Sequence, residues 1–187
     1  MSNIKIEIEQ FDPIDLREMA DVNLMNRIDT KFAFRQDDLM RFLPLLAQHY
    51  RALKVEGTML PHYESLYFDD ESFSFFRDHH NGKADRFKVR IRKYVESNIH
   101  FLEIKHKIKG RTDKRRILTN DFNELQEEKE RDFLRRQLQE DTKLRPTMWN
   151  SFQRITLVSK TSKERLTLDL NIHFHMGDIQ RDFKQLI

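Results

Sequence analysis

Basic side chains recur at every second position along one stretch of the sequence. The members of this series, all cationic and two residues apart, are Arg86, Lys88, Arg90 and Arg92. Side chains two residues apart in a β-strand point to the same face. Four like charges on one face repel one another unless an anion or an acidic group lies opposite. Guanidinium forks match phosphate oxygens and lysine adds a point charge, so the series predicts a site for a phosphate-rich anion.

Neighbouring segments carry cations in the same alternating manner. The charged residues that share strand faces elsewhere are Arg27, Asp29 and Lys31, then Glu103, Lys105 and Lys107, then Lys114 and Arg116, and finally Arg165 and Asp169, with Arg154 in the preceding segment. A solvated outer face is the alternative interpretation, because antiparallel sheets commonly expose one polar face. Such faces usually mix signs, whereas here the recurrent residue is cationic. We therefore favour a shared hollow lined by Arg and Lys.

Acidic residues lie among these cations, and two roles are open for them. Glu103 and Asp169 are candidate oxygen ligands for a divalent metal, which prefers carboxylates. The other role for each acid is an ion pair that balances the neighbouring positive charge.

Length and composition narrow the class of protein. The chain has 187 residues and a formal net charge of +3, which fits a single domain spanning 1–187. It contains no cysteine, which excludes disulfides, thiolate metal sites and a cysteine nucleophile. No apolar run approaches the roughly 18 residues of a membrane helix, and no secretory signal is visible. We expect a cytoplasmic protein without a membrane span.

The spacing of apolar residues predicts the elements that position the cations. Alternation predicts strands over 26–35, 62–69, 84–96, 99–108, 113–119, 147–159 and 163–174. Helical spacing predicts helices over 36–50 and 121–140, with a short irregular or helical link over 71–80. This order predicts an α+β domain of mostly antiparallel strands with inserted helices. If the sheet closes toward a barrel, the cations line its interior, where a bound polyanion neutralises them.

Several of these stretches are similar, in order and spacing, to motifs of the VTC domain. This is the polyphosphate polymerase domain of the triphosphate tunnel superfamily, which is related to the CYTH phosphatases. The matching stretches are RIDTKF at 27–32, YFD at 67–69, KVRIRKY at 88–94, FLEIK at 101–105, GRTDKRR at 110–116, FQR at 152–154 and RLTLD at 165–169. The resemblance runs from about residue 20 to the C-terminus, and the ordered set is what makes it specific.

The resemblance implies an antiparallel β-barrel that forms a tunnel lined with Arg and Lys. It implies binding of triphosphate or polyphosphate, and transfer of the γ-phosphate of ATP to a growing polyphosphate chain with a divalent metal, Mn or Mg. The residues that it places in the basic catalytic site are Lys31, Arg90, Arg92, Lys105, Lys114, Arg154 and Arg165. Alongside these we place Arg27, Lys88 and Arg116 as further phosphate-binding residues.

Two positions depart from the family pattern. The family often has tyrosine where this chain has Phe152, so a phenolic hydroxyl that could bond phosphate is absent there. Family members also continue into a further strand with a Glu-x-Lys pattern, whereas this sequence stops at Ile187, where that strand should begin. We therefore expect either a truncated chain or a natural barrel without its last strand, which would bind phosphate weakly and not turn over.

Other functions stay open beside the polymerase. A non-catalytic module that binds polyphosphate or inositol phosphates is one alternative, and a tunnel triphosphatase that releases phosphate is another. Nucleic-acid binding is disfavoured, because single strands stack on aromatic rings and Phe32 and Phe87 have the opposite parity to the cations. His173 and His175 share a strand face, but we favour a surface pair over metal ligands.

Overall fold

The computed structural model describes residues 2–20, 30–122, 125–138 and 142–183. The chain divides into two compact units. The first comprises Met1–Tyr63, Ser151–His173 and Arg181–Ile187, and the second comprises Glu64–Asn150 and Phe174–Gln180. The expectation of a single domain stays a prediction.

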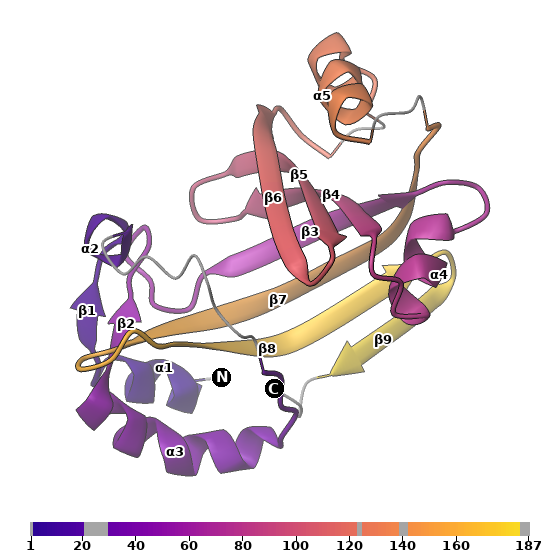
Figure 1. The fold of residues 1–187 in the computed structure, drawn as a ribbon. Helices are drawn as coiled ribbons and strands as arrows, with labels where there is room; N and C mark the ends of the chain where they lie inside the picture. Colours follow the sequence, from indigo (N-terminus) through magenta and orange to yellow (C-terminus); the bar gives the residue numbers. More distant parts are fainter. Residues whose placement is uncertain (1, 21–29, 123–124, 139–141, 184–187) are drawn as a thin grey trace. The chain divides into compact units, whose positions relative to one another are not determined.

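The second unit is built on neighbouring strands that carry the basic series. β3 (His62–Asp69, of which residues 64–69 belong here) lies next to β4 (Arg86–Tyr94), and β5 (Ile99–Ile108) and β6 (Arg111–Thr119) follow (Figure 1). β4, β5 and β6 pair antiparallel, each with the next. Gly110, in the tight turn from β5 to β6, has a φ of 81°, which glycine adopts without steric cost. The sequence prediction of strands here is confirmed.

One face of this sheet packs into an apolar core. Val89 and Ile91 of β4 and Leu102 and Ile104 of β5 alternate with the charged positions and are buried. Helix α5 (Glu128–Leu138) adds Leu134 and Leu138 to the same core. The opposite face therefore carries the alternating cations of β4 and β5, together with Lys114 and Arg116 of β6.

Two aspartates fix the start of helix α4 (Ser74–His80), which follows β3. The carboxylate of Asp69 accepts hydrogen bonds from the backbone N–H groups of Phe75 and Phe76. Asp70 accepts from the backbone N–H groups of Ser72 and Ser74 and from both hydroxyls. Partial burial opposes ionisation of Asp70, but these hydrogen bonds outweigh it and lower the pKa of the carboxyl to about 2.

The first unit contains a parallel strand pair. β1 (Asp12–Ile14) pairs with β2 (Tyr50–Leu53) in parallel, and β2 pairs antiparallel with β7 (Arg145–Ser159). The chain between β1 and β2 carries helices α2 (Leu16–Ala20) and α3 (Gln36–His49), a long crossover of the kind that parallel pairing needs. The sheet is therefore mixed, which agrees with the prediction of mostly antiparallel strands but not with the wholly antiparallel barrel that the resemblance implies.

The remaining strands are β8 (Arg165–Met176) and β9 (Ile179–Phe183). β8 pairs with β7 and with β9. Strands β7, β8 and β9 each contribute residues to both units.

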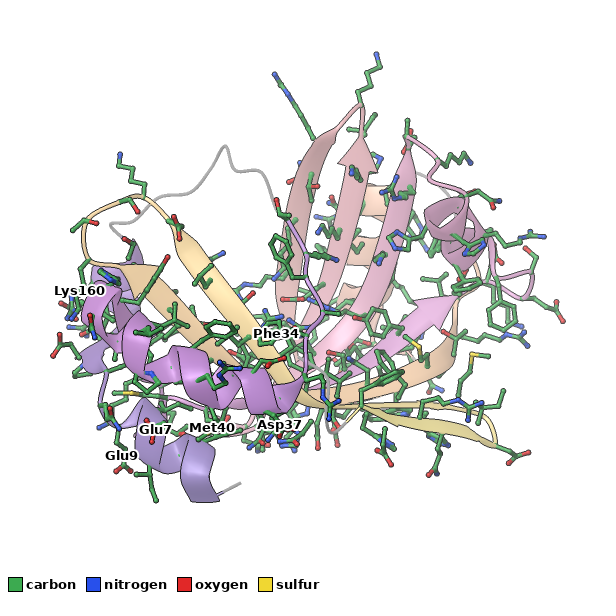
Figure 2. All side chains as sticks on the ribbon, turned by 90° about the horizontal axis from the view of Figure 1, so that it is seen from below. Glu7, Glu9, Phe34, Asp37, Met40 and Lys160 are labelled. Atoms are coloured by element: carbon green, nitrogen blue, oxygen red, sulfur yellow. The ribbon has the colours of Figure 1, made fainter. Side chains whose placement is uncertain are left out.

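Two helices cover the core of the first unit. Ile4 and Ile8 of α1 (Ser2–Ile8) pack with Leu39 and Leu43 of α3, together with buried residues of β7 and β8. Figure 2 shows α1 beside α3, with Asp37 and Met40 labelled on α3. Lys160, labelled in the same figure, follows β7 and forms an ion pair of 2.7 Å with Asp12. The short elements α1, α2, β1 and β2 were not predicted from the sequence.

The strand predicted over 26–35 is wrong where it can be compared. Residues 30–34 lie outside helices and strands, and α3 begins at Gln36. Residues 26–29 lie outside the described part of the chain. Alternation alone does not make a strand, because a strand also needs a hydrogen-bonding neighbour. Among the described residues, no helix is long and apolar enough to cross a membrane.

Candidate functional site

The register of three strands aligns the cations of the second unit into rows. Lys88 of β4, Lys105 of β5 and Lys114 of β6 lie side by side in one row. The next row consists of Arg90, Glu103 and Arg116. The full set, called the basic face below, is Arg86, Lys88, Arg90 and Arg92 of β4, Glu103, Lys105 and Lys107 of β5, and Lys114 and Arg116 of β6. The sequence prediction of a shared cationic face is confirmed for these strands.

A buried carboxylate lies at the centre of the basic face. The Glu103 side chain is only 2% exposed, and Arg90 donates to its Oε2 atom from Nε at 2.9 Å and from Nη2 at 2.7 Å. The Nζ atom of Lys114 forms an ion pair with the other oxygen, Oε1, at 2.6 Å. One negative charge is thus shared between two cations, and the cluster keeps a surplus positive charge.

The ionisation of this cluster reflects competition between burial and charge. Burial opposes ionisation of Glu103, but the charges of Arg90 and Lys114 outweigh it and lower the pKa of the carboxyl below its ordinary value. Burial, together with the charges of Arg90 and Arg116, lowers the pKa of Lys114, although Glu103 opposes the change. The Glu103 carboxylate is therefore the group that keeps the cations together.

Strand β3 supplies hydroxyl groups beside the guanidinium groups of β4. Arg90 Nη1 donates to the hydroxyl of Tyr67 at 3.0 Å, and Arg92 Nε donates to Oγ of Ser65 at 3.1 Å. Both Ser65 and Arg92 are buried. Neither hydroxyl was predicted as part of the site. Ser65 and Tyr67 alternate with the core residues Leu66 and Phe68, so the period of two could have assigned them to the polar face.

An aromatic ring supports the outer cation of the second row. The guanidinium carbon of Arg116 lies 4.3 Å from the centre of the Phe101 ring, close enough for a cation–π interaction. The ring holds Arg116 on the basic face without using its N–H donors, which suits a group that binds an anion.

The first unit holds a second pairing of arginine with a carboxylate. Arg154 Nε donates to Oδ1 of Asp169 at 2.5 Å and Nη2 donates to Oδ2 at 2.6 Å. The guanidinium carbon lies 5.0 Å from the Phe152 ring centre and 5.9 Å from that of Tyr63, and these two rings stack at 5.3 Å. Phe152, where the family often has tyrosine, thus packs beneath Arg154.

The two acids predicted as metal ligands do not fit a divalent ion in this arrangement. Both oxygens of Glu103 contact cations of Arg90 and Lys114, and both oxygens of Asp169 accept from Arg154. In the described part of the chain, no three His, Cys, Asp or Glu residues come together as a metal site. A metal ion would have to displace those cations.

The remaining predicted site residues belong to the first unit or lie outside the described part of the chain. Lys31 is exposed and precedes α3, and Arg165 begins β8 in the first unit, half-buried. Arg27 lies outside the described residues. The Nδ1 atom of His173 lies 2.6 Å from Oδ1 of Asp182 on β9, within hydrogen-bonding distance. The shared face thus holds Arg90, Arg92, Lys105 and Lys114 among the predicted catalytic residues.

The comparisons with known proteins agree with the motifs in the sequence. The family described as VTC domain matches residues 26–186, which is nearly the whole chain. No curated protein matches the chain closely enough to count as a relative. The match includes all of the basic face and is consistent with placement in the triphosphate tunnel superfamily. The chain therefore belongs to the VTC domain family, and this membership supports a function related to polyphosphate.

Proposed function

We propose that the basic face binds the phosphate groups of triphosphate or polyphosphate. The observation that carries this proposal is the row of Lys88, Lys105 and Lys114, three like charges on neighbouring strands. Like charges directly opposite each other are unfavourable. Glu103 is the one acid among these aligned residues and is already shared by Arg90 and Lys114. A bound polyanion would add negative charge to a face on which cations outnumber acids.

The mixture of cation types suits a chain of phosphoryl groups. Arginine donors bind phosphate oxygens in pairs, while lysines follow a flexible chain as point charges. Positive charge also suits phosphoryl transfer, because enzymes catalyse this reaction mainly by positioning the reactants and by electrostatic stabilisation of the transition state. Family membership supports the finer proposals, which are a closed basic tunnel and ATP-dependent polyphosphate synthesis.

Calorimetric titration with sodium tripolyphosphate tests the binding proposal. Arg90→Ala and Lys105→Ala should each weaken binding at least about tenfold, roughly 1.4 kcal/mol. Lys129→Ala is the matched control, because Lys129 lies on α5, which packs on the opposite face of the sheet. Added salt should weaken wild-type binding, because the contacts are between charges. Unchanged affinity in both basic-face variants would refute the proposal.

Incubation with ATP and Mn²⁺ or Mg²⁺ tests the chemistry. A ladder of polyphosphate on a gel would support the polymerase, with the metal requirement read by adding a chelator. Phosphate release without polymer would overturn the polymerase in favour of a triphosphatase. Tripolyphosphate binding with neither product would leave a binding module as the function.

A further inference from the structure

We infer that Tyr67 is a positioning residue, which orients the guanidinium of Arg90 so that one fork of N–H donors is offered to a phosphoryl group. The inference rests on the proposed function, because it concerns how the basic face receives its ligand. Tyr67 lies on β3 and its hydroxyl accepts a hydrogen bond from Nη1 of Arg90 at 3.0 Å. Tyr67 belongs to the YFD stretch at 67–69 that resembles the family, but no role in the site was predicted for it.

A count of donors shows what the contact achieves. A guanidinium has five N–H groups, one on Nε and two on each of Nη1 and Nη2. The Nε–H and one Nη2–H point to Oε2 of Glu103, and one Nη1–H points to Tyr67. Those are the contacts of Arg90 with other side chains in the described part of the chain. One N–H on Nη1 and one on Nη2 are left, a pair that matches two oxygens of one phosphoryl group.

Glu103 alone would not fix this orientation. Both of its hydrogen bonds from Arg90 converge on a single oxygen, Oε2, so they act as one pivot about which the guanidinium can tilt. The Tyr67 hydroxyl is a second, separate point of attachment on the other terminal nitrogen. Two points of attachment hold the plane of the guanidinium, and a fixed plane reduces the ordering needed when the ligand binds.

Tyr67 is itself held by the neighbouring strand. Its backbone carbonyl accepts a hydrogen bond from the hydroxyl of Thr147 on β7 at 3.1 Å. The ring also lies near the Arg90 charge, with 5.8 Å between the guanidinium carbon and the ring centre. Tyr67→Phe keeps the ring and the strand and removes only the hydroxyl, which makes it a clean test of positioning.

A double-mutant cycle measured by calorimetry with tripolyphosphate tests the inference. Tyr67→Phe should weaken binding about fivefold, because a hydrogen bond to a charged group is lost. Arg90→Lys removes the planar fork, so Tyr67→Phe added to Arg90→Lys should weaken binding less than about twofold further. Tyr94→Phe is the control for the loss of a phenolic hydroxyl. Tyr94 lies on β4, the strand of Arg90, and its ring packs edge-on against Phe101.

The possible results separate the inference from the proposed function. The positioning role would be overturned if Tyr67→Phe weakened tripolyphosphate binding equally in the wild-type and Arg90→Lys backgrounds. It would also be overturned if Tyr67→Phe bound tripolyphosphate as tightly as the wild type does. In either case the proposal of phosphate binding would stand. If wild-type protein does not bind tripolyphosphate, the proposed function fails. Nitrogen-15 NMR of Arg90 then still decides the positioning claim. In the wild type, hindered rotation of the Arg90 guanidinium should give separate Nη1 and Nη2 signals. In Tyr67→Phe the two signals should merge. Signals that stay separate in Tyr67→Phe would contradict the positioning role.

Discussion

Two arginine–carboxylate clusters, one in each unit, differ in how their charges balance. In the first unit Arg154 and Asp169 pair one to one, with a separate donor for each oxygen. In the second unit Glu103 serves both Arg90 and Lys114. The first cluster is electrically closed, whereas the second keeps a positive surplus. The comparison indicates that the Arg154 pair holds β7 to β8, while the Glu103 cluster is arranged to receive an anion.

The largest difference between the clusters should appear in stability. Glu103→Gln leaves two cations beside a buried neutral amide, and we expect the free energy of unfolding to fall by about 3 kcal/mol. Asp169→Asn should cost only about 1 kcal/mol, because both partners are roughly a third exposed and solvent screens the pair. Urea denaturation of the two variants measures both values. Equal losses would remove the distinction between the clusters.

A smaller effect should separate binding from stability within the second cluster. Lys114→Gln removes surplus charge at a side chain that is 44% exposed, so it should weaken tripolyphosphate binding about fivefold, near 1 kcal/mol. Its unfolding midpoint in urea should move little. Lys129→Gln on α5 is the control for removing a lysine charge from the same unit. If Lys114→Gln lowered the free energy of unfolding strongly and left tripolyphosphate affinity unchanged, the Glu103 cluster would have a structural role only.

The smallest effect should be a dependence of stability on pH that comes from outside both clusters. Hydrogen bonds from Ser72 and Ser74 lower the pKa of Asp70 from 3.8 to about 2. Because the pKa of Asp70 is lower in the folded state than in the unfolded chain, its carboxylate stabilises the folded protein at pH values above 3.8. This stabilisation is lost as the pH falls from 3.8 toward 2. Asp70→Asn should flatten this part of the stability curve, followed by fluorescence in urea. An unchanged slope would show that α4 does not depend on this carboxylate.

The basic face could be predicted from the sequence because the strand period of two is a local property. Parity assigned Arg90, Lys105 and Lys114 to the cationic face of their own strands, and the register aligns these three faces. The ion pair was one of the two roles left open for Glu103, but its two partners could not be predicted, because parity leaves the alignment between strands open. Tyr67 was missed for the same reason: its role depends on β3 lying beside β4.

Prediction failed where structure depends on distant partners. The polar and aromatic alternation of 26–35 resembles a strand, yet residues 30–34 are irregular, with Lys31 and Phe32 exposed. The parallel pairing of β1 with β2 joins segments separated by two helices, so no local period predicts it. The buried side of α1 could be recognised only beside α3.

Strand β6 ends the strand order of the second unit, so its outer edge faces no further strand of the described chain. An open edge of this kind is a template on which another copy of a protein can stack and aggregate. Lys114, Arg115 and Arg116 follow one another along it, and two copies meeting edge to edge would bring these like charges into contact. Lys114 and Arg116 of the basic face, together with Arg115 on the other face of β6, thus also oppose aggregation at this edge.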